Sequence, residues 1–121
     1  MRIIERQFHS SLQNLVKSDW KKIVMAYEPV WAIGTGKTAT PDQAEDVQAF
    51  IRSLLRKQIG ETIDEVRILY GGSIKPENIE SLMAEPNIDG GLVGGASLKA
   101  ESFIEIVKRS IPKKETTEIK Q

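Results

Sequence analysis

Three short apolar segments, each followed by a helical pattern, constrain the fold of this chain most. Residues 22–27 and 66–70 are nearly continuous apolar runs of strand length, and a shorter run lies near residues 91–93. Runs of this kind favour parallel strands that are covered on both faces. Glu28 and Pro29 end the first run, and paired glycines end the other two. Strands that alternate with helices predict an α/β fold with a parallel sheet and right-handed crossovers.

Helical patterns follow these runs and also open the chain. Thr40 and Pro41 form a strong helix start, because Thr is a favoured N-cap, Pro fits the first helical position and Gln43 completes a capping box. Gly60 is a suitable stop for that helix. The expected helices carry apolar residues from position 4 to 16, at Val47, Phe50, Ile51, Leu54 and Leu55, over residues 77–83, and at Phe103, Ile104, Ile106 and Val107 before Pro112.

The composition narrows the possible functions. The chain has 121 residues, 17 basic and 17 acidic side chains, one histidine and no cysteine. A formal net charge of zero removes the long-range field on which binding to nucleic acid or membranes usually depends, so we expect neither partner. Without cysteine, disulfides, thiolate catalysis and zinc–thiolate sites are excluded. No signal peptide or membrane-spanning run is recognisable, so a soluble, cytoplasmic protein without metal or cofactor is expected.

The ends of the strands carry the residues with candidate chemistry, because ligands of parallel α/β sheets bind beyond the carboxyl ends of the strands. Apolar enclosure of Glu28 would raise its pKa toward the range of a general base, whereas a solvated or salt-bridged glutamate is the alternative. The following loop, residues 29–37, carries Trp31 and Ile33. Apolar residues in such a loop indicate a lid that covers a ligand, or a loop packed permanently on its own core.

Two nucleotide-binding motifs are excluded in the same loop. Residues 36–38 resemble the end of a phosphate-binding P-loop, but Trp31 occupies the position of its first glycine. Residues 34–39 fit a dinucleotide pattern, yet Pro41 starts the helix only after the motif. The second strand also lacks the acidic residue that would bind a ribose.

Two glycine pairs suggest a phosphate site. Gly71 and Gly72 precede Ser73, and Gly94 and Gly95 follow the third run. Glycine lets backbone N–H groups approach a ligand without obstruction by a Cβ atom, and N–H groups at a helix start hold phosphate. A tight turn between strand and helix is the alternative for either pair alone. The two pairs together favour phosphate binding.

Residues 26–41, 70–73 and 89–98 together resemble the C-terminal half of the triosephosphate isomerase family. The resemblance covers about residues 5–111 and implies a partial (β/α)8 barrel, with three parallel strand–helix units preceded by a helix. It divides the chain into residues 1–111, the C-terminal part of a barrel domain, and residues 112–121, a polar tail that we expect to be disordered. Gly91 departs from the pattern, since many members carry a larger residue there.

The resemblance also implies the reaction. The family interconverts dihydroxyacetone phosphate and D-glyceraldehyde 3-phosphate through an ene-diolate, in glycolysis and gluconeogenesis. Glu28 corresponds to the base that moves the proton between adjacent carbons, and Leu92 to a residue packed beside it. The residues that correspond to phosphate donors are Gly34, Ser73, Gly94 and Gly95.

The loop after Glu28 corresponds to the family's lid, with a hinge at each end and a latch from the second strand. Ser73 and Tyr70 correspond to latch residues that contact the lid near Gly36 and Ala39. His9, on the first helix, is expected to be a surface residue without a catalytic role. The lid and latch residues implied by the resemblance are Pro29, Val30, Trp31, Ala32, Ile33, Thr35, Gly36, Lys37, Thr38, Ala39 and Tyr70.

Other parts of the family pattern are missing from this sequence. The family's substrate-binding lysine, its electrophilic histidine and the loop that forms its dimer interface all precede the matched region. The first helix lacks a capping residue, which we interpret as a cut end. The resemblance therefore implies an isomerase fragment that is inactive until the N-terminal half of the barrel is supplied. A non-catalytic half-barrel module that binds phosphate is the alternative.

Overall fold

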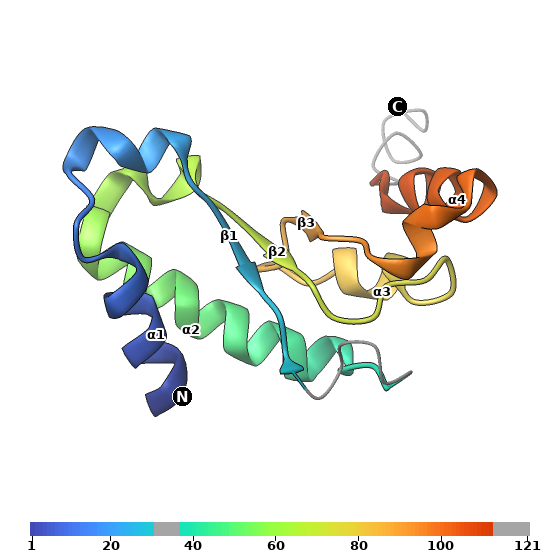
Figure 1. Cartoon of the computed structure of the whole chain (residues 1–121), viewed down its shortest axis with the longest axis horizontal. Coiled ribbons are helices and arrows are strands. Elements are labelled where there is room, and N and C mark those ends of the chain that lie inside the picture. Colours follow the sequence, from blue (N-terminus) through green and yellow to red (C-terminus); the bar gives the residue numbers. More distant parts are fainter. Residues whose placement is uncertain (31–36, 113–121) are drawn as a thin grey trace, which may run out of the picture.

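The computed structural model describes residues 1–30 and 37–112 (Figure 1). Residues 31–36 of the expected lid, and residues 113–121 of the expected tail 112–121, lie outside the described residues. The elements, with η for 3-10 helices, are α1 (Arg2–Leu12), η1 (Lys17–Lys22), β1 (Val24–Tyr27), α2 (Pro41–Ile59), η3 (Gly60–Glu65), β2 (Arg67–Tyr70), α3 (Ile79–Met83), β3 (Gly90–Gly91), η4 (Gly95–Leu98) and α4 (Ala100–Ser110).

The three strands form one parallel sheet in the order β1-β2-β3, as the sequence predicts. Val24 pairs with Arg67 at the start of β1, and Leu69 pairs with Gly90 at the start of β3. Two expected boundaries are wrong. The first strand starts at Val24 because the preceding residues form η1, and β3 is confined to Gly90–Gly91.

Local chemistry sets the ends of α2. The Gln43 N–H donates to Thr40 Oγ1 at 3.1 Å, and the Thr40 N–H donates to Gln43 Oε1 at 3.0 Å, so the predicted capping box is confirmed. Gly60 ends the helix with φ of +63°, a conformation that only glycine adopts without strain. The first helix ends at Leu12, earlier than expected, and the chain then forms η1, at whose start Asp19 accepts from the Val16 N–H at 3.0 Å.

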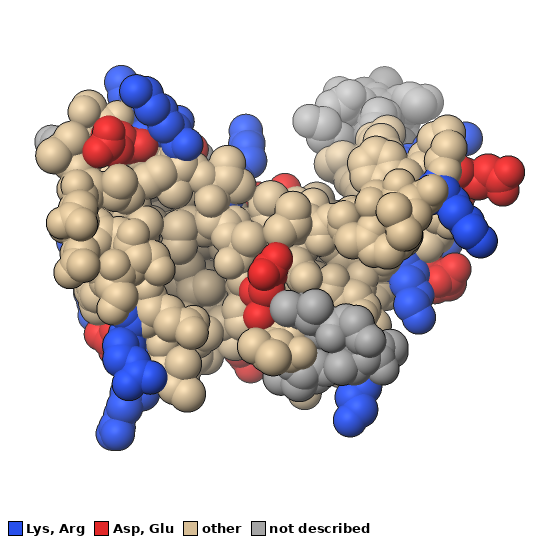
Figure 2. Space-filling view, viewed as in Figure 1, with Lys and Arg blue, Asp and Glu red and all other residues tan. Residues whose placement is uncertain are grey.

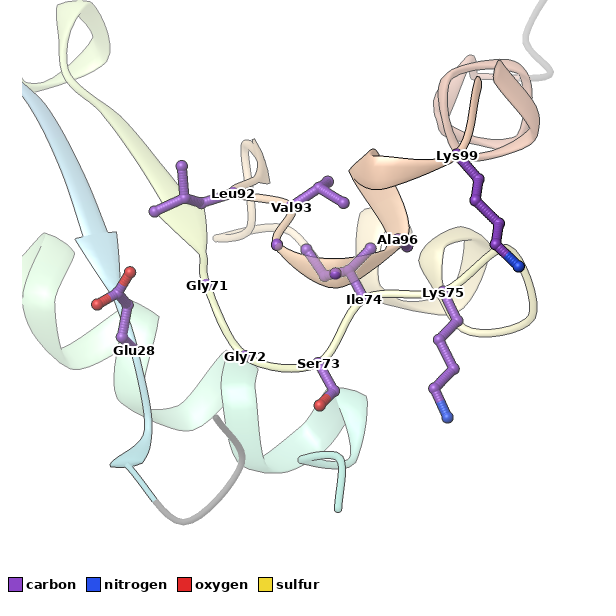
Figure 3. A pocket seen from close by; sticks show the side chains of 12 residues that line it. Glu28, Gly71, Gly72, Ser73, Ile74, Lys75, Leu92, Val93, Ala96 and Lys99 are labelled. Atoms are coloured by element: carbon purple, nitrogen blue, oxygen red, sulfur yellow. The ribbon is translucent and has the colours of Figure 1, made fainter. Parts of the chain in front are cut away.

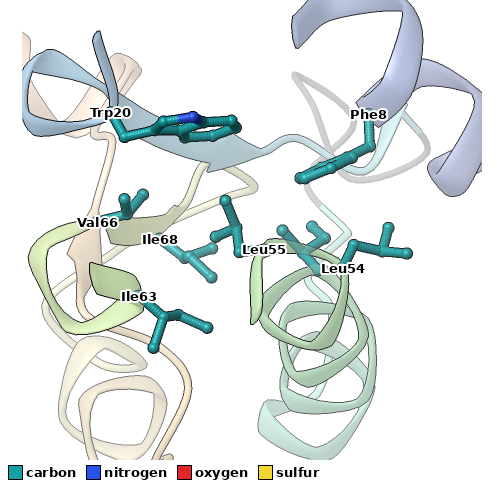
Figure 4. Close-up of a cluster of buried hydrophobic side chains, with 8 residues drawn as sticks. Phe8, Trp20, Leu54, Leu55, Ile63, Val66 and Ile68 are labelled. Atoms are coloured by element: carbon teal, nitrogen blue, oxygen red, sulfur yellow. The ribbon is translucent and has the colours of Figure 1, made fainter. Parts of the chain in front are cut away.

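Two apolar clusters hold the elements together. The first lies between α1, α2, η1 and the sheet, and Leu55 and Ile68 in it have no exposed surface (Figure 4). The second packs α3 and α4 against the end of β2 around Tyr70, Ile79 and Leu82. Gly91 belongs to this packing, since a Cβ atom there would lie 2.6 Å from Ile74 Cδ1. The Ile74 side chain thus fills the space beside this departure from the family pattern.

A polar network links α2 to the segment before β3. Arg52 Nη2 lies 2.6 Å from Asp89 Oδ2, which also accepts from the Ile68 N–H at 2.9 Å. Gln48 is fully buried, and its Nε2 donates to the carbonyls of Ile68 and Asn87 at 3.2 and 3.0 Å. The side chain of a helix residue therefore bridges β2 and the segment before β3.

The other face of the sheet is open. Val24 is 61% exposed and Ala26 is exposed, whereas Met25 and Tyr27 pack on the first cluster. The expectation that the first strand is covered on both faces is thus wrong for the described chain. Figure 2 shows that the middle of this side of the molecule carries few charged side chains. On α4, Phe103, Ile104 and Val107 are also 42–52% exposed.

None of the helices in the described segments is long and apolar enough to cross a lipid bilayer.

Candidate active site

Three chain segments meet at the carboxyl edge of the sheet, as the order of strands and glycine turns predicts. Glu28 follows β1, Gly71 to Ser73 follow β2, and Leu92 to Gly95 follow β3. They line one open groove of about 720 Å³ (Figure 3). The lining residues are Glu28, Gly71, Gly72, Ser73, Ile74, Lys75, Leu92, Val93, Gly94, Gly95, Ala96 and Lys99.

Glu28 lies at one side of this groove. Its side chain is exposed while Pro29 is buried, so the described residues give Glu28 the solvated environment that the sequence analysis held as the alternative to apolar enclosure. The Gly71 N–H donates to the Tyr27 carbonyl at 2.8 Å and brings the two strand ends together. A Cβ atom at position 71 would lie 2.7 Å from Glu28 Cγ. The absence of a side chain at Gly71 therefore makes room for the Glu28 side chain.

Tyr70 connects the end of β2 to Ala39, at the C-terminal end of the expected lid. It has no exposed surface, and its hydroxyl accepts from the Ala39 N–H at 3.4 Å. Burial raises the pKa of Tyr70, and the Ala39 N–H lowers it in part. Burial, and then the neighbouring Tyr70, raise the pKa of Tyr27. A Cβ atom at Gly72 would overlap the Tyr70 hydroxyl, so glycine is required there.

Asn78 fixes the backbone after Gly72. Its Oδ1 accepts from the Lys75 N–H at 2.8 Å, and its Nδ2 donates to the Ser73 carbonyl at 3.0 Å. One side chain thus holds both the Ser73 carbonyl and the Lys75 N–H of this turn. Sequence analysis missed Asn78, although an Asn three residues after a turn position is a recognisable hydrogen-bonding pattern.

The second glycine pair has different surroundings. A Cβ atom at Gly94 or Gly95 would meet no atom within 4 Å in the described chain. The Gly94 carbonyl accepts from the Ser97 N–H at 2.9 Å and from Ser97 Oγ at 2.6 Å, which forms the first turn of η4. Internal packing of the described residues therefore does not require glycine at these positions.

Within residues 1–30 and 37–112, no group of three or more His, Cys, Asp or Glu side chains is arranged to hold a metal ion. His9 is exposed on α1, where it lies 3.8 Å from Glu5 and packs edge-on against Phe8.

Comparison with known proteins accounts for this arrangement. The family profile described as "Triosephosphate isomerase" matches residues 1–110. The chain belongs to the triosephosphate isomerase family. The expected fold, a partial (β/α)8 barrel with three parallel strands, agrees with this assignment.

Relatives named triosephosphate isomerase support the assignment. Those from Flavobacterium johnsoniae, Chloroherpeton thalassium and Carboxydothermus hydrogenoformans are 55%, 55% and 59% identical to this chain over 106, 107 and 110 residues. The alignments cover 87–90% of this chain and 42–44% of the relatives. The chain thus spans less than half the length of the relatives that it matches, and it matches their C-terminal part.

The structure places the residues expected from the triosephosphate isomerase family as follows. Glu28, Ser73, Gly94 and Gly95 line the same groove, and Leu92 lines it beside them. Near the lid, Pro29 and Ala39 are buried, whereas Val30, Lys37 and Thr38 are exposed. The expected phosphate donor Gly34 and the lid residues Trp31, Ala32, Ile33, Thr35 and Gly36 lie outside the described residues.

Proposed function

We propose that this chain supplies the base, the lid and most of the phosphate site of a triosephosphate isomerase. The observation that carries the proposal is the groove that Glu28 shares with Ser73, Gly94 and Gly95. Its substrates would be dihydroxyacetone phosphate and D-glyceraldehyde 3-phosphate.

The phosphate group would be bound by backbone N–H groups of the two glycine turns and by Gly34 of the lid. Two features support this assignment. Asn78 holds the turn that contains Ser73 by its hydrogen bonds at both ends. Glycine at positions 94 and 95 leaves space that the described chain does not fill, which suits close approach of a ligand to the backbone.

Glu28 would act as the base. A carboxylate at one side of the groove and a phosphate at the other would place the carbon chain of the substrate between them. The Glu28 carboxylate would take a proton from the carbon beside the carbonyl, which leaves an ene-diolate, and would return the proton to the neighbouring carbon. The developing oxyanion needs a hydrogen-bond donor, and the family's histidine and lysine for this task have no counterpart among the aligned positions here.

Catalysis would therefore require the rest of the barrel. The open face of β1, with Val24 and Ala26 exposed, and the exposed apolar side chains of α4 supply surfaces for the other strand–helix units.

From the family we also propose a cytoplasmic location and a dimer for the assembled enzyme, and we propose that residues 1–111 belong to a single barrel domain. A phosphate-binding module without catalysis would not need Glu28 beside the phosphate turns, so the isomerase is preferred.

Complementation tests the proposal. The region of the Carboxydothermus hydrogenoformans relative that this chain does not match would be co-expressed with the chain, and isomerisation of D-glyceraldehyde 3-phosphate would be measured. We expect turnover by the mixture and none by either polypeptide alone. Turnover by the 121-residue chain alone would show that the missing groups are not required, and an inactive mixture that nevertheless forms a complex would contradict the assignment of the base.

A further inference from the structure

Two lysines line the groove in addition to the residues considered so far. Lys75 lies in the turn after Ser73, and Lys99 lies at the N-cap of α4. Figure 3 shows both lysines across the groove from Glu28, with side chains that extend away from it. The two ends of the groove therefore differ in charge.

Three ion pairs are established between described residues, and neither lysine takes part in them. They join Glu5 to His9, Arg52 to Asp89 and Glu105 to Arg109. Glu28 is the only carboxylate among the described residues that line the groove. The lysine charges are consequently available to an anion that enters from solvent.

Lys99 is an unusual residue for the N-cap of a helix. The residue before a helix is usually Ser, Thr, Asp or Asn, and a cation there is repelled by the positive end of the helix dipole. Lys99 makes no capping hydrogen bond with its side chain. A bound anion would offset this repulsion, so the placement is understandable if an anion occupies the groove.

The backbone segments that carry the two lysines are also connected. The Lys75 N–H is bound by Asn78, and Arg109 Nη1 of α4 donates to the Pro76 carbonyl at 2.8 Å. The turn that carries Lys75 is thus fastened to the helix that begins after Lys99. Their charges add at one edge of the groove on a chain whose formal net charge is zero.

We propose that Lys75 and Lys99 attract and hold the phosphate dianion of the substrate at the entrance of the phosphate turns. This inference rests on the proposed function, since it assigns an additional role at the same site. Backbone donors bind the phosphate oxygens directly, whereas the lysines act on its charge over several ångströms. Their contribution should therefore decrease as salt screens the charges.

Inorganic phosphate is a direct probe of this role. The 121-residue chain would be labelled with nitrogen-15 and titrated with phosphate at low and high ionic strength, with the backbone amides of Ser73, Gly94 and Gly95 as reporters. The test variant is K75Q/K99Q. The matched control is K21Q/K22Q, which removes two exposed lysines from η1, at the far end of the molecule (Figure 1).

We expect the K75Q/K99Q variant to bind phosphate about 3- to 10-fold more weakly than the unsubstituted chain at low salt, from Coulomb interactions over several ångströms. At high salt the difference should shrink to about twofold or less. The control should bind like the unsubstituted chain, and K75R/K99R should retain most of the affinity. In the complemented enzyme, K75Q/K99Q should raise KM and leave kcat nearly unchanged.

The possible failures are distinct. If phosphate shifts none of the three reporter amides in the unsubstituted chain, the proposed phosphate site is wrong, and this inference is wrong with it. If phosphate shifts the reporters but K75Q/K99Q and K21Q/K22Q have the same affinity, the site stands and the role of the lysines is overturned. Because all four lysines are exposed, we expect the variants to fold like the unsubstituted chain.

Discussion

The backbone N–H of Ala39 donates a hydrogen bond of 3.4 Å to the hydroxyl of Tyr70, 31 residues later in the chain. Both residues are buried, and they join the C-terminal end of the expected lid to the end of β2. The contact thus sets where one end of the lid is attached relative to the groove.

Substitution of Tyr70 by phenylalanine should destabilise the chain by about 1 kcal/mol, because the buried Ala39 N–H loses its acceptor. Urea unfolding would measure the change. Tyr27→Phe is a suitable control, because Tyr27 lies next to Tyr70 with ring centroids 6.5 Å apart and no described residue is shown to hydrogen-bond its hydroxyl. Equal stability of the two variants would mean that the Ala39 contact contributes nothing.

Stability should fall at alkaline pH. Burial raises the pKa of Tyr70 and Tyr27 above the ordinary value of 10.0, so the folded state retains these protons to higher pH than the unfolded state. The contribution is fully present below pH 10.0 and is lost as the pH rises through the folded-state values. Urea midpoints of the unsubstituted chain and of Y27F/Y70F would be compared from about pH 8 to 11. A steeper alkaline decline in the double variant would contradict this account.

Arg52 and Asp89 should be coupled in stability. Their charged atoms lie 2.6 Å apart, and the side chains are 14% and 25% exposed, so removal of one partner leaves a partly buried charge. We expect Arg52→Met to cost about 2 kcal/mol. Asp89→Asn should cost less, because an amide oxygen can still accept from the Ile68 N–H. A double-mutant cycle measures the interaction free energy between the two side chains. Strictly additive effects would show that Arg52 and Asp89 do not stabilise each other.

Gly71→Ala should impair catalysis more than stability. A Cβ atom there would lie 2.7 Å from Glu28 Cγ, so the carboxylate must move. Displacement of a catalytic group by about 1 Å can lower the rate roughly 100-fold, and the complemented enzyme would report this loss in kcat. The control is Gly60→Ala, where φ of +63° is strained for alanine but Glu28 is remote. If both variants lose activity in proportion to stability, Gly71 has no positioning role.

Those parts of the fold that depend on neighbouring residues could be predicted from the sequence. The capping box of Thr40 and Gln43 and the stop at Gly60 are local, and both were placed correctly. The meeting of Glu28 with Ser73, Gly94 and Gly95 at one groove follows from the rule that parallel strands end at a common edge.

Other features depend on contacts between distant residues. Gln48 is polar and was not expected in the core. It is nevertheless fully buried, because its side-chain amide donates hydrogen bonds to the carbonyls of Ile68 and Asn87. The run of residues 22–27 indicated a strand covered on both faces. One face of β1 is exposed in the described chain, because the elements that would cover it are not among the described residues. The need for glycine at position 71 likewise arises from contact with Glu28, which lies far from it in the sequence.

Substitution of Glu28 by glutamine tests the central claim most directly. The amide has nearly the same shape as the carboxylate but cannot act as a base. Isomerisation of D-glyceraldehyde 3-phosphate would be measured in the complemented mixture with either form of the chain, and complex formation would be verified for both. The account predicts a loss of about 100- to 10,000-fold in kcat with Glu28→Gln. A mixture that remains as active with glutamine as with glutamate would contradict it.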